Sequence, residues 1–461
     1  MSKYLIVGGG VSGCTAAGEL ARLGHEATIL ERDARFGGKV LDYCCKATDS
    51  CSRCGVCVAV SQLHETASQK RVHISTASTI REVRWDGAVS VRVTRRNPYI
   101  DPGLCIGCDA CLKACPAKCI QRQQKAELVQ YVVDYADCRL QSGKECAACA
   151  KACPVQAITA GASESTLTLG ADALLVATGH QPFDAARKIR LGYGRFPGVM
   201  TGTEAEELLS RQESLGEPAG SVAFIQCVGS RDPKEGRNYC SAVCCAYALR
   251  LARMLKYRQP KTEISIYYID LQNFDKTFTR LREELTASGI RFLRAIPFRV
   301  EQSSSGKLQL YIEDPDGGQS IVEHDRVVLS VGMEPASQAG ELAEKLGLKR
   351  NEFGFFAAAA EGKLFVTGTC AQPLSIPDCM SSARATAAAM GASPPRAARA
   401  SERYGAAGPS KAASGPPRAT AEAKGKARTP VRASERFGAA RGKAKTPAQA
   451  RKGASQAGRR A

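Results

Sequence analysis

The sequence lacks several features that would define other classes of protein. It has one tryptophan, five histidines and six methionines in 461 residues. No run approaches the roughly 18 consecutive apolar residues that a membrane-spanning helix needs. The N-terminus enters a strand directly, without the basic and apolar segments of a secretion signal, and the histidines are scattered without metal-ligand spacing. These absences argue against a membrane-spanning, exported or histidine-ligated metal protein, and we expect a soluble protein of the cytoplasm.

Acidic residues are scarce near the C-terminus. Residues 392–461 hold 17 Lys and Arg against 3 Glu and account for most of the net charge of +19. This segment consists largely of Ala, Gly, Ser, Pro and basic residues, with too little apolar surface to offset the entropy cost of ordering. We therefore expect residues 392–461 to be a disordered Ala/Lys/Arg-rich tail of unknown role. Charge alone is weak evidence for binding nucleic acid.

Cysteine, by contrast, occurs 21 times. In a long chain without a secretion signal, this abundance points to metal or redox chemistry instead of a disulfide framework. Short apolar strands alternate with helical stretches, which is typical of α/β folds with parallel sheets. The length allows two or three domains.

A dinucleotide-binding pattern opens the chain. Gly8-x-Gly10-x-x-Gly13 follows the strand KYLIV and opens a helix predicted over Ser12–Leu23, which is the context that this pattern requires. Gly8 permits a tight turn, Gly10 lets a pyrophosphate approach the backbone, and Gly13 lets helix and strand pack closely. Glu31 ends the second strand and is placed to accept a ribose hydroxyl.

Two cysteine runs that end in Cys-Pro interrupt the α/β pattern, which suggests an inserted module. They match the two-cluster ferredoxin motif, in which the fourth cysteine of each run ligates the other cluster. The predicted ligands of one [4Fe–4S] cluster are Cys105, Cys108, Cys111 and Cys153. Those of the other cluster are Cys138, Cys146, Cys149 and Cys115.

The second run departs from the simple motif, because seven residues separate Cys138 from Cys146. Zinc sites made of four cysteines use similar short spacings and are the alternative. Cys119 is left over and is expected to be a small buried side chain.

Two further cysteine groups lie outside this module, CCKATDSCSRCGVC and QCVGSRDPKEGRNYCSAVCC. Cys51, Cys54 and Cys57 have cluster-type spacing and need one remote thiolate. Cys44 or Cys45 could supply it locally, or one of the second group could supply it across a domain boundary, the candidates being Cys240, Cys244 and Cys245. We predict a third [4Fe–4S] cluster, with a zinc knuckle or free buried thiols as the alternative.

Three later segments, RDARFGGKV, LLVATGHQPFD and LFVTGTCAQPLSIPDCM, resemble the flavin-contacting segments of the two-dinucleotide-domain flavoproteins, to which thioredoxin reductases belong. This resemblance implies FAD and a helix N-terminus facing the flavin ring. The residues that it assigns to the flavin are Gly38, Thr178, Gly179, Gly368 and Asp378. Thr369 stands where many of these flavoproteins have an aspartate.

Taken together, the glycine motif, the inserted ferredoxin run, IQCVGSRD…YCSAVCC and GTCAQPLSIPD resemble the A subunit of heterodisulfide reductase over about residues 1–391. The resemblance implies partners such as the B and C subunits or another redox protein. It leaves flavin-based electron bifurcation and a homodimer open.

The second nucleotide domain of such flavoproteins should carry its own glycine motif, yet VAFIQCVGSRD supplies only Gly229. We therefore expect this protein to exchange electrons with another protein and not with a nicotinamide cofactor.

The expected order of domains is a FAD-binding domain (1–97, 162–190 and 331–391), an inserted ferredoxin module (98–161), a second Rossmann-like domain (191–330) and the tail (392–461).

The sequence therefore predicts an oxidoreductase, a FAD- and iron–sulfur-containing electron-transfer subunit. The alternatives are a self-contained NAD(P)H-dependent flavoprotein oxidoreductase, of the glutamate synthase small-subunit kind, and a nucleic-acid or scaffold-binding protein that acts through the tail.

Overall fold

The computed structural model describes residues 1–392 except 212–214, 216–219, 273–277, 314–316 and 358–361. The predicted tail therefore lies outside the described residues, apart from Ala392. Among the described helices, none combines the length and the hydropathy needed to cross a lipid bilayer.

The N-terminal strand belongs to a five-stranded parallel sheet with the order β22-β11-β1-β2-β3. Its strands are β1 (Lys3–Val7), β2 (Glu26–Leu30), β3 (Val72–Ser75), β11 (Ala173–Val176) and β22 (Leu364–Val366). All four residues of β11 are buried, as expected for parallel strands that are covered on both faces.

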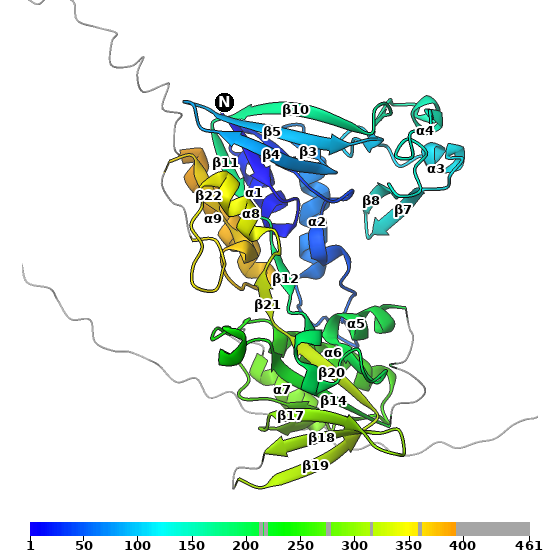
Figure 1. Ribbon diagram of the computed structural model, residues 1–461, viewed down its shortest axis with the longest axis vertical. Coiled ribbons are helices and arrows are strands. Elements are labelled where there is room, and N and C mark those ends of the chain that lie inside the picture. Colours follow the sequence, from blue (N-terminus) through cyan, green and yellow to red (C-terminus); the bar gives the residue numbers. More distant parts are fainter. Residues whose placement is uncertain (212–214, 216–219, 273–277, 314–316, 358–361, 393–461) are drawn as a thin grey trace, which may run out of the picture. The chain divides into compact units, whose positions relative to one another are not determined.

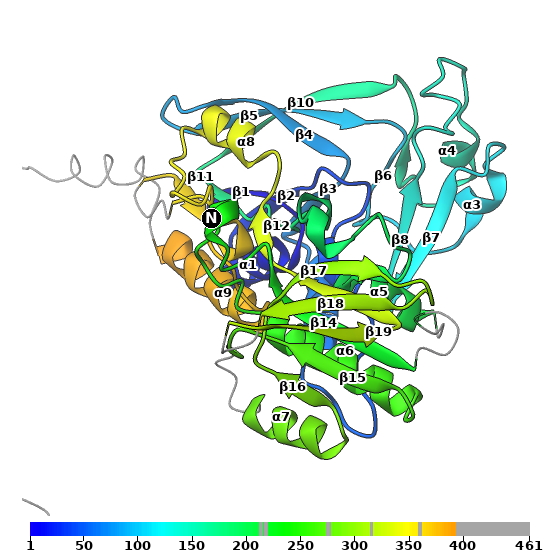
Figure 2. The same cartoon turned by 60° about the horizontal axis from the view of Figure 1, so that its bottom comes forward.

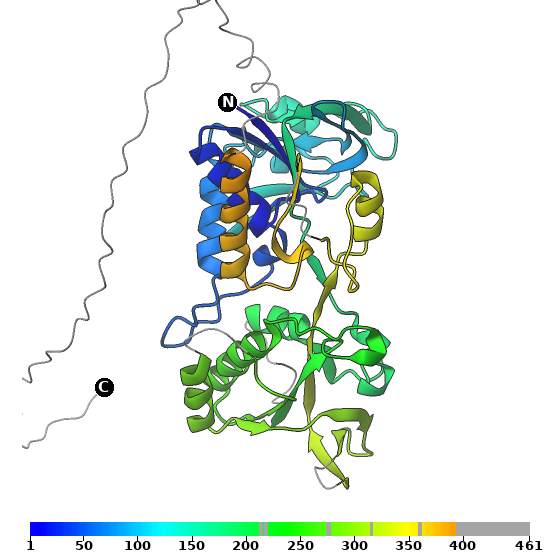
Figure 3. The same cartoon turned by 90° about the vertical axis from the view of Figure 1, so that its left-hand side faces the viewer.

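Three helices pack together on one face of this sheet (Figures 1 and 3), namely α1 (Val11–Arg22), α2 (Val56–Ala67) and α9 (Ile376–Ala392). The helix predicted over Ser12–Leu23 is thus present one residue earlier. Small side chains let the helices approach closely, since Ala16 and Ala17 of α1 and Ala383 and Ala387 of α9 are all fully buried. The other face is covered by α8 (Ala339–Leu346) and an antiparallel sheet of β4 (Ser78–Arg84), β5 (Val89–Arg96) and β10 (Glu164–Ala171).

The Cys-rich module leaves this antiparallel sheet after β5 and returns at β10 (Figure 1). It contains two short helices that contact each other, α3 (Ala110–Ala114) and α4 (Ala148–Ala152). Two small antiparallel pairs frame them. One is β6 (Tyr99–Ile100) with β9 (Ile158–Thr159), and the other is β7 (Ile120–Lys125) with β8 (Leu128–Val133).

A second parallel sheet has the order β13-β20-β14-β15-β16. Its strands are β13 (Val199–Thr201), β14 (Ser221–Val228), β15 (Glu263–Tyr267), β16 (Arg291–Leu293) and β20 (Arg326–Val331). The helices of this half are α5 (Gly202–Ser210), α6 (Cys244–Arg258) and α7 (Phe278–Ala287). An antiparallel sheet of β17 (Pro297–Gln302), β18 (Leu308–Glu313) and β19 (Gln319–His324) packs on it (Figure 2).

The chain passes between the two parallel sheets through a pair of antiparallel strands, β12 (His180–Pro182) and β21 (Met333–Pro335). Short 3-10 turns complete the described elements: Gly38–Leu41, Ala185–Arg187, Ile189–Leu191, Pro233–Glu235 and Gly368–Cys370.

Candidate functional site

A cavity of about 1000 Å³ opens where β1 ends, and residues from both parallel-sheet halves line it. Seven of the nine residues predicted to bind the cofactor lie on its wall: Gly8, Gly10, Glu31, Gly38, Thr178, Gly179 and Asp378. The other two, Gly13 and Gly368, are closely packed, since a Cβ atom at Gly13 would meet the Gly8 carbonyl oxygen and one at Gly368 would lie 2.2 Å from the hydroxyl oxygen of Ser12. The volume lies at the upper end of the range that small-molecule and cofactor sites use.

The glycines of the motif meet different surroundings. A Cβ atom at Gly13 would lie 1.9 Å from the carbonyl oxygen of Gly8, so this position is closed by the contact between α1 and β1. A Cβ atom at Gly10 would meet nothing within 4 Å and would point into open space. The backbone thus leaves room beside Gly10 and at the start of α1, where a pyrophosphate binds in dinucleotide folds. This cradle fits a dinucleotide such as FAD.

Glu31 is held at the edge of the cradle by the backbone. Its Oε2 accepts a hydrogen bond from Gly9 N at 2.7 Å, and its Oε1 accepts one from Asp33 N at 2.8 Å. Burial raises the pKa of Glu31, and the two amide hydrogen bonds oppose this rise. Glu31 lines the cavity, and among the described residues its carboxylate accepts these two amide hydrogen bonds and none from a basic side chain.

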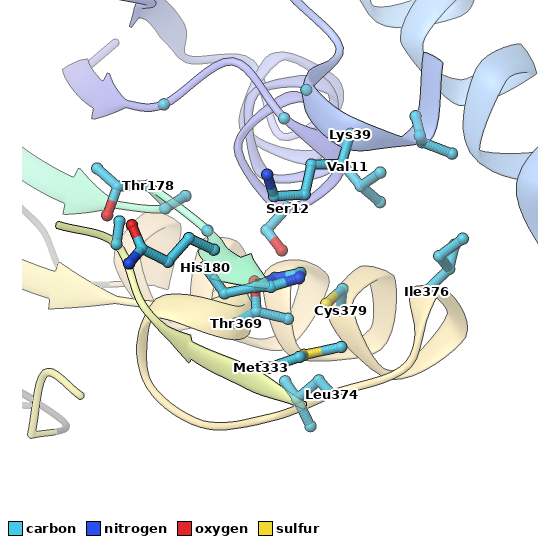
Figure 4. A pocket seen from close by; sticks show the side chains of 18 of the residues that line it. Val11, Ser12, Lys39, Thr178, His180, Met333, Thr369, Leu374, Ile376 and Cys379 are labelled. Carbon is cyan, nitrogen blue, oxygen red and sulfur yellow. Dashed lines mark hydrogen bonds between the residues drawn. The ribbon is translucent and has the colours of Figure 1, made fainter. Parts of the chain in front are cut away.

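The opposite wall of the cavity is formed by the segments that contain His180, Thr369 and Cys379 (Figure 4). His180 Nδ1 lies 3.0 Å from Thr369 Oγ1. Burial lowers the pKa of His180 to about 4, so this ring is neutral at neutral pH. Burial also raises the pKa of Cys379, in the first turn of α9, to about 11. Two neutral side chains thus lie beside the N-terminus of α9, where the helix dipole favours negative charge.

The Cys-rich module brings the predicted ligands of each cluster together. A small cavity is lined by Cys105, Cys108 and Cys111 of the first run and by Cys153 of the second run. Burial raises the pKa of Cys105, and the charge of Cys153 contributes. Burial also raises the pKa of Cys149, and three other thiolates add to the rise, those of Cys115, Cys146 and Cys138.

Thiols of the two runs therefore lie near one another in the module. Within the described residues, no group of three or more Cys, His, Asp or Glu side chains is arranged to hold a metal ion. The fit to the clusters consequently depends on the chemistry of the donor set, eight thiols in two groups of four, and on the cavity beside Cys105.

A further group of four thiols lies between the end of β14 and the start of α6, formed by Cys227, Cys240, Cys244 and Cys245. The Cys244 thiol interacts with both Cys227 and Cys245, and these interactions and burial raise its pKa well above the usual value. The same interactions lower the pKa of Cys227 and lower that of Cys245 to about 7. Burial raises the pKa of Cys240, and the charges of Cys227 and Cys245 contribute. Thiols with lowered pKa values are the better metal ligands.

Sequence reasoning did not assign Cys227 to a metal site. The signal was present, because Cys-x12-Cys-x3-Cys-Cys is an unusual spacing, but the turn that folds β14 back onto α6 is not visible in the spacing alone. Cys51 and Cys57 are exposed, and Cys54 is half-buried on the cavity wall. Among the described residues, the polar contacts of these three cysteines include no thiol of the four-thiol group; Cys51 Sγ accepts a hydrogen bond from Arg53 N.

The turn after β14 is closed at the position where a nucleotide-binding glycine would lie. A Cβ atom at Gly229 would lie 2.1 Å from the ring of Phe183. The segment that would receive a pyrophosphate in a second nucleotide site is thus covered by an aromatic side chain and continues into the four-thiol group.

The loop before Cys51 is fixed to the second half by a buried polar network. Lys46 forms an ion pair with Glu206 of α5, and Tyr247 of α6 donates a hydrogen bond to the same carboxylate at 2.5 Å. Cys44 N donates to Glu206 Oε1 at 2.6 Å. Lys46 Nζ also lies 5.3 Å and 5.2 Å from the ring centroids of Tyr43 and Tyr247. Lys46 and Tyr247 both line the large cavity, as does Cys244.

Comparisons with known proteins agree with this architecture. Residues 6–69 match the NAD(P)-binding Rossmann-like domain and residues 104–157 match the 4Fe-4S dicluster domain. The chain is therefore an α/β protein with an NAD(P)-binding Rossmann-like domain, a second parallel sheet and an inserted 4Fe-4S dicluster domain, which agrees with the predicted fold class.

More particularly, the chain is a relative of the A subunit of heterodisulfide reductase, which confirms the resemblance predicted from the sequence. It is 31% identical to the second iron-sulfur A subunit of the CoB--CoM heterodisulfide reductase of Methanopyrus kandleri, over 84% of this chain and 63% of the relative. It is 33% identical to the A subunit of the Ferredoxin/F(420)H(2)-dependent CoB-CoM heterodisulfide reductase of Methanosarcina acetivorans, over 77% of this chain and 47% of the relative. The chain thus spans less than two thirds of the length of these relatives.

Among solved structures, T. acidophilum thioredoxin reductase aligns with 85% of this chain and 98% of its own length. The alignment has a TM-score of 0.48 and 13% sequence identity.

Proposed function

We propose that the chain is an electron-transfer oxidoreductase subunit that binds FAD and three [4Fe–4S] clusters and exchanges electrons with partner proteins. The observation that carries this proposal is the position of Cys244, which belongs to the four-thiol group and also lines the cavity that contains Gly10. A cluster held by this group would be adjacent to the bound flavin. When bound, FAD would supply two-electron chemistry and the clusters one-electron transfer.

Each proposed cofactor has a set of residues suited to hold it. The flavin would be held by Gly8, Gly10, Glu31 and the residues of the opposite wall, with Asp378 in the first turn of α9. The ferredoxin clusters would take the two crossed sets of thiols. For the third cluster we propose Cys227, Cys240, Cys244 and Cys245 as ligands, in place of the set built on Cys51, Cys54 and Cys57. The predicted domain boundaries remain part of this proposal.

The residues around the flavin site have roles that follow from their ionisation. Neutral His180 and protonated Cys379 add no negative charge beside the N-terminus of α9, so Asp378 is the acidic side chain in the first turn of this helix, where the helix dipole favours negative charge. The covered turn at Gly229 supports a protein, not a nicotinamide, as the electron donor or acceptor. Partners resembling the B and C subunits of heterodisulfide reductase fit this role, and the site would work in the cytoplasm. The proposal extends to flavin-based electron bifurcation and to assembly of the chain as a homodimer.

Anaerobic purification with cofactor analysis tests the proposal. We expect one FAD and about 12 iron atoms per chain, a flavin that NADH and NADPH alone reduce poorly, and co-purifying redox proteins. About 8 iron atoms would remove the third cluster from the proposal. Rapid reduction of the flavin by NADH or NADPH would favour the self-contained NAD(P)H-dependent oxidoreductase. Protein that is folded but contains zinc and no flavin would overturn the whole assignment.

A further inference from the structure

The two halves of the Cys-rich module repeat the same local structure after their Cys-Pro pairs. The first half reads Cys-Pro-Ala-Lys-Cys-Ile over residues 115–120, and the second reads Cys-Pro-Val-Gln-Ala-Ile over residues 153–158. The fourth residue of each has a left-handed backbone, with φ of +52° at Lys118 and +54° at Gln156. Each repeat then enters a short strand at its isoleucine.

Cys119 and Ala157 occupy the same position in this repeat. They are 4% and 3% exposed. The turns that precede them match, because the Lys118 N–H donates to the Cys115 carbonyl oxygen at 3.2 Å and the Gln156 N–H donates to the Cys153 carbonyl oxygen at 3.3 Å. The backbone N–H of Ala157 also donates a hydrogen bond to Cys153 Sγ at 3.2 Å, and the backbone of Cys119 acts on the sulfur of Cys115 in the same sense by lowering its pKa. The backbone role is therefore identical in the two halves. The second half performs it with a methyl group, so the thiol of Cys119 is not needed for it.

The extra thiol faces two proposed ligands of the second cluster. Cys119 Sγ lies 3.5 Å from Cys115 Sγ. Cys119 and Cys138 pack in the same buried cluster, and Cys138 helps to raise the pKa of the Cys119 thiol. This cluster site therefore has five thiols, whereas the first cluster site has four, with Ala157 at the equivalent position.

The two neighbours of Cys119 differ in how firmly they are fixed. The backbone of Cys119, Ala117 and Lys118 lowers the pKa of Cys115 against the opposing effect of burial, and the Lys118 N–H donates a hydrogen bond to the Cys115 carbonyl oxygen at 3.2 Å. Backbone donors placed in this way stabilise a thiolate. Cys138 is separated by seven residues from the next ligand, Cys146, where the first half has only two residues between Cys105 and Cys108. Cys138 is thus the ligand that a local rearrangement can most readily remove.

We propose that Cys119 is an alternative ligand of the second [4Fe–4S] cluster and can take the place of Cys138. This inference rests on the crossed ligand sets of the proposed function. In the exchange one iron–sulfur bond to Cys138 breaks and one to Cys119 forms. The proton of the Cys119 thiol is transferred to the departing Cys138 thiolate, so neither the charge of the ligand set nor the oxidation state of the cluster changes. The exchange would keep the second cluster bound when Cys138 is displaced or chemically modified.

The test compares four variants of the full chain, purified anaerobically, by iron and sulfide content and by the EPR spectrum of the reduced protein. Cys119→Ala makes the two halves alike and should keep the wild-type iron content and spectrum. Cys138→Ala should keep its iron but show a shifted EPR signal, because one ligand has changed. Cys119→Ala/Cys138→Ala should lose about four iron atoms per chain.

The matched control is Cys105→Ala, which removes the equivalent ligand from the first cluster site, the site that has Ala157 in place of a fifth thiol. It should lose about four iron atoms, because no fifth thiol is present there. The inference is overturned if Cys138→Ala loses as much iron as the double variant, or if the double variant keeps the iron that Cys138→Ala keeps. Flavin content and far-ultraviolet circular dichroism show that each variant is folded. Wild-type protein without iron would instead overturn the proposed function, which separates the two failures.

Discussion

Lys46 and Glu206, 160 residues apart in the sequence, form an ion pair in which only 2% of each side chain is exposed. The pair joins the loop that contains Cys44 and Cys45 to helix α5, which packs on the second parallel sheet. Because Cys44 and Tyr247 also donate hydrogen bonds to Glu206, the carboxylate is fully engaged. Such a pair fixes the geometry of its neighbours more than it adds net stability.

Removing one partner of this pair should be costly. In Lys46→Met, Glu206 is left as a buried charge without its cation, which typically costs about 3–5 kcal/mol. The measurement is the free energy of unfolding in urea, monitored by circular dichroism. Arg211→Ala is the control, because it breaks an ion pair with Glu207 in which each side chain is 58% exposed, and such pairs contribute about 0–1 kcal/mol. If the two variants had the same free energy of unfolding, the Lys46–Glu206 pair would not behave as a buried ion pair.

Two glycines of the nucleotide motif should respond differently to alanine. In Gly13→Ala the new Cβ would lie 1.9 Å from the Gly8 carbonyl oxygen, so we expect a loss of both stability and flavin. In Gly10→Ala the Cβ meets no protein atom within 4 Å, so the melting temperature of the flavin-free protein should stay within about 2 °C of wild type. Flavin content should nevertheless fall at least tenfold, because the methyl group fills the space beside the pyrophosphate. Full flavin occupancy in Gly10→Ala would contradict the cradle.

The spacing of the glycines predicts that they lie close together, whereas the spacing of the cysteines in the four-thiol group does not. Gly8, Gly10, Gly13 and Glu31 are linked by one strand–helix–strand unit, so their spacing alone predicts their proximity. The four-thiol group depends on how the turn after β14 packs against α6 under Phe183. The cysteine spacing does not specify that packing and therefore does not indicate Cys227 as a ligand.

Long-range pairs were inaccessible for a related reason. Nothing in the sequence near Lys46 indicates Glu206 as its partner, since the two residues come from parts of the chain that belong to different sheets and meet only in the folded protein. The ferredoxin runs were easier, because duplicated short spacings specify both halves of the module. Even there, Cys119 looked like an ordinary small buried residue, and only its contacts with Cys115 and Cys138 distinguish it from Ala157.

Flavin retention should depend on pH through Glu31. Burial raises the pKa of this carboxyl in the folded protein, so the folded chain holds its proton more tightly than the unfolded chain does. The stability that this proton contributes is present at low pH and is lost as the pH rises through the raised pKa. As the pH rises through this pKa, Glu31 becomes the carboxylate that can accept a hydrogen bond from a ribose hydroxyl of the flavin nucleotide. Flavin affinity should therefore increase with pH, starting above the ordinary glutamate pKa of about 4.3.

The measurement is flavin fluorescence in the filtrate after equilibration between pH 4 and pH 8, values chosen to bracket the ordinary pKa range of about 4.3 upwards. Glu31→Gln keeps the size of the side chain but cannot ionise, so its flavin affinity should be lower and flat across this interval. A wild-type pH profile retained in Glu31→Gln would assign the titration to another group.

The ligands of the third cluster can be decided by two cysteine variants. Cys227→Ser removes a thiol whose interaction with Cys244 lies inside the four-thiol group, so about four iron atoms per chain should be lost and one EPR signal should disappear. Cys57→Ser changes an exposed thiol of the other candidate set and should leave iron content and spectrum unchanged. The reverse pattern would restore the set built on Cys51, Cys54 and Cys57.

Because Cys244 lines the flavin cavity, loss of this cluster should also slow electron transfer between the flavin and an external acceptor, whereas loss of a solvent-exposed zinc knuckle would not. The two variants therefore test both where the third cluster lies and whether it is coupled to the flavin.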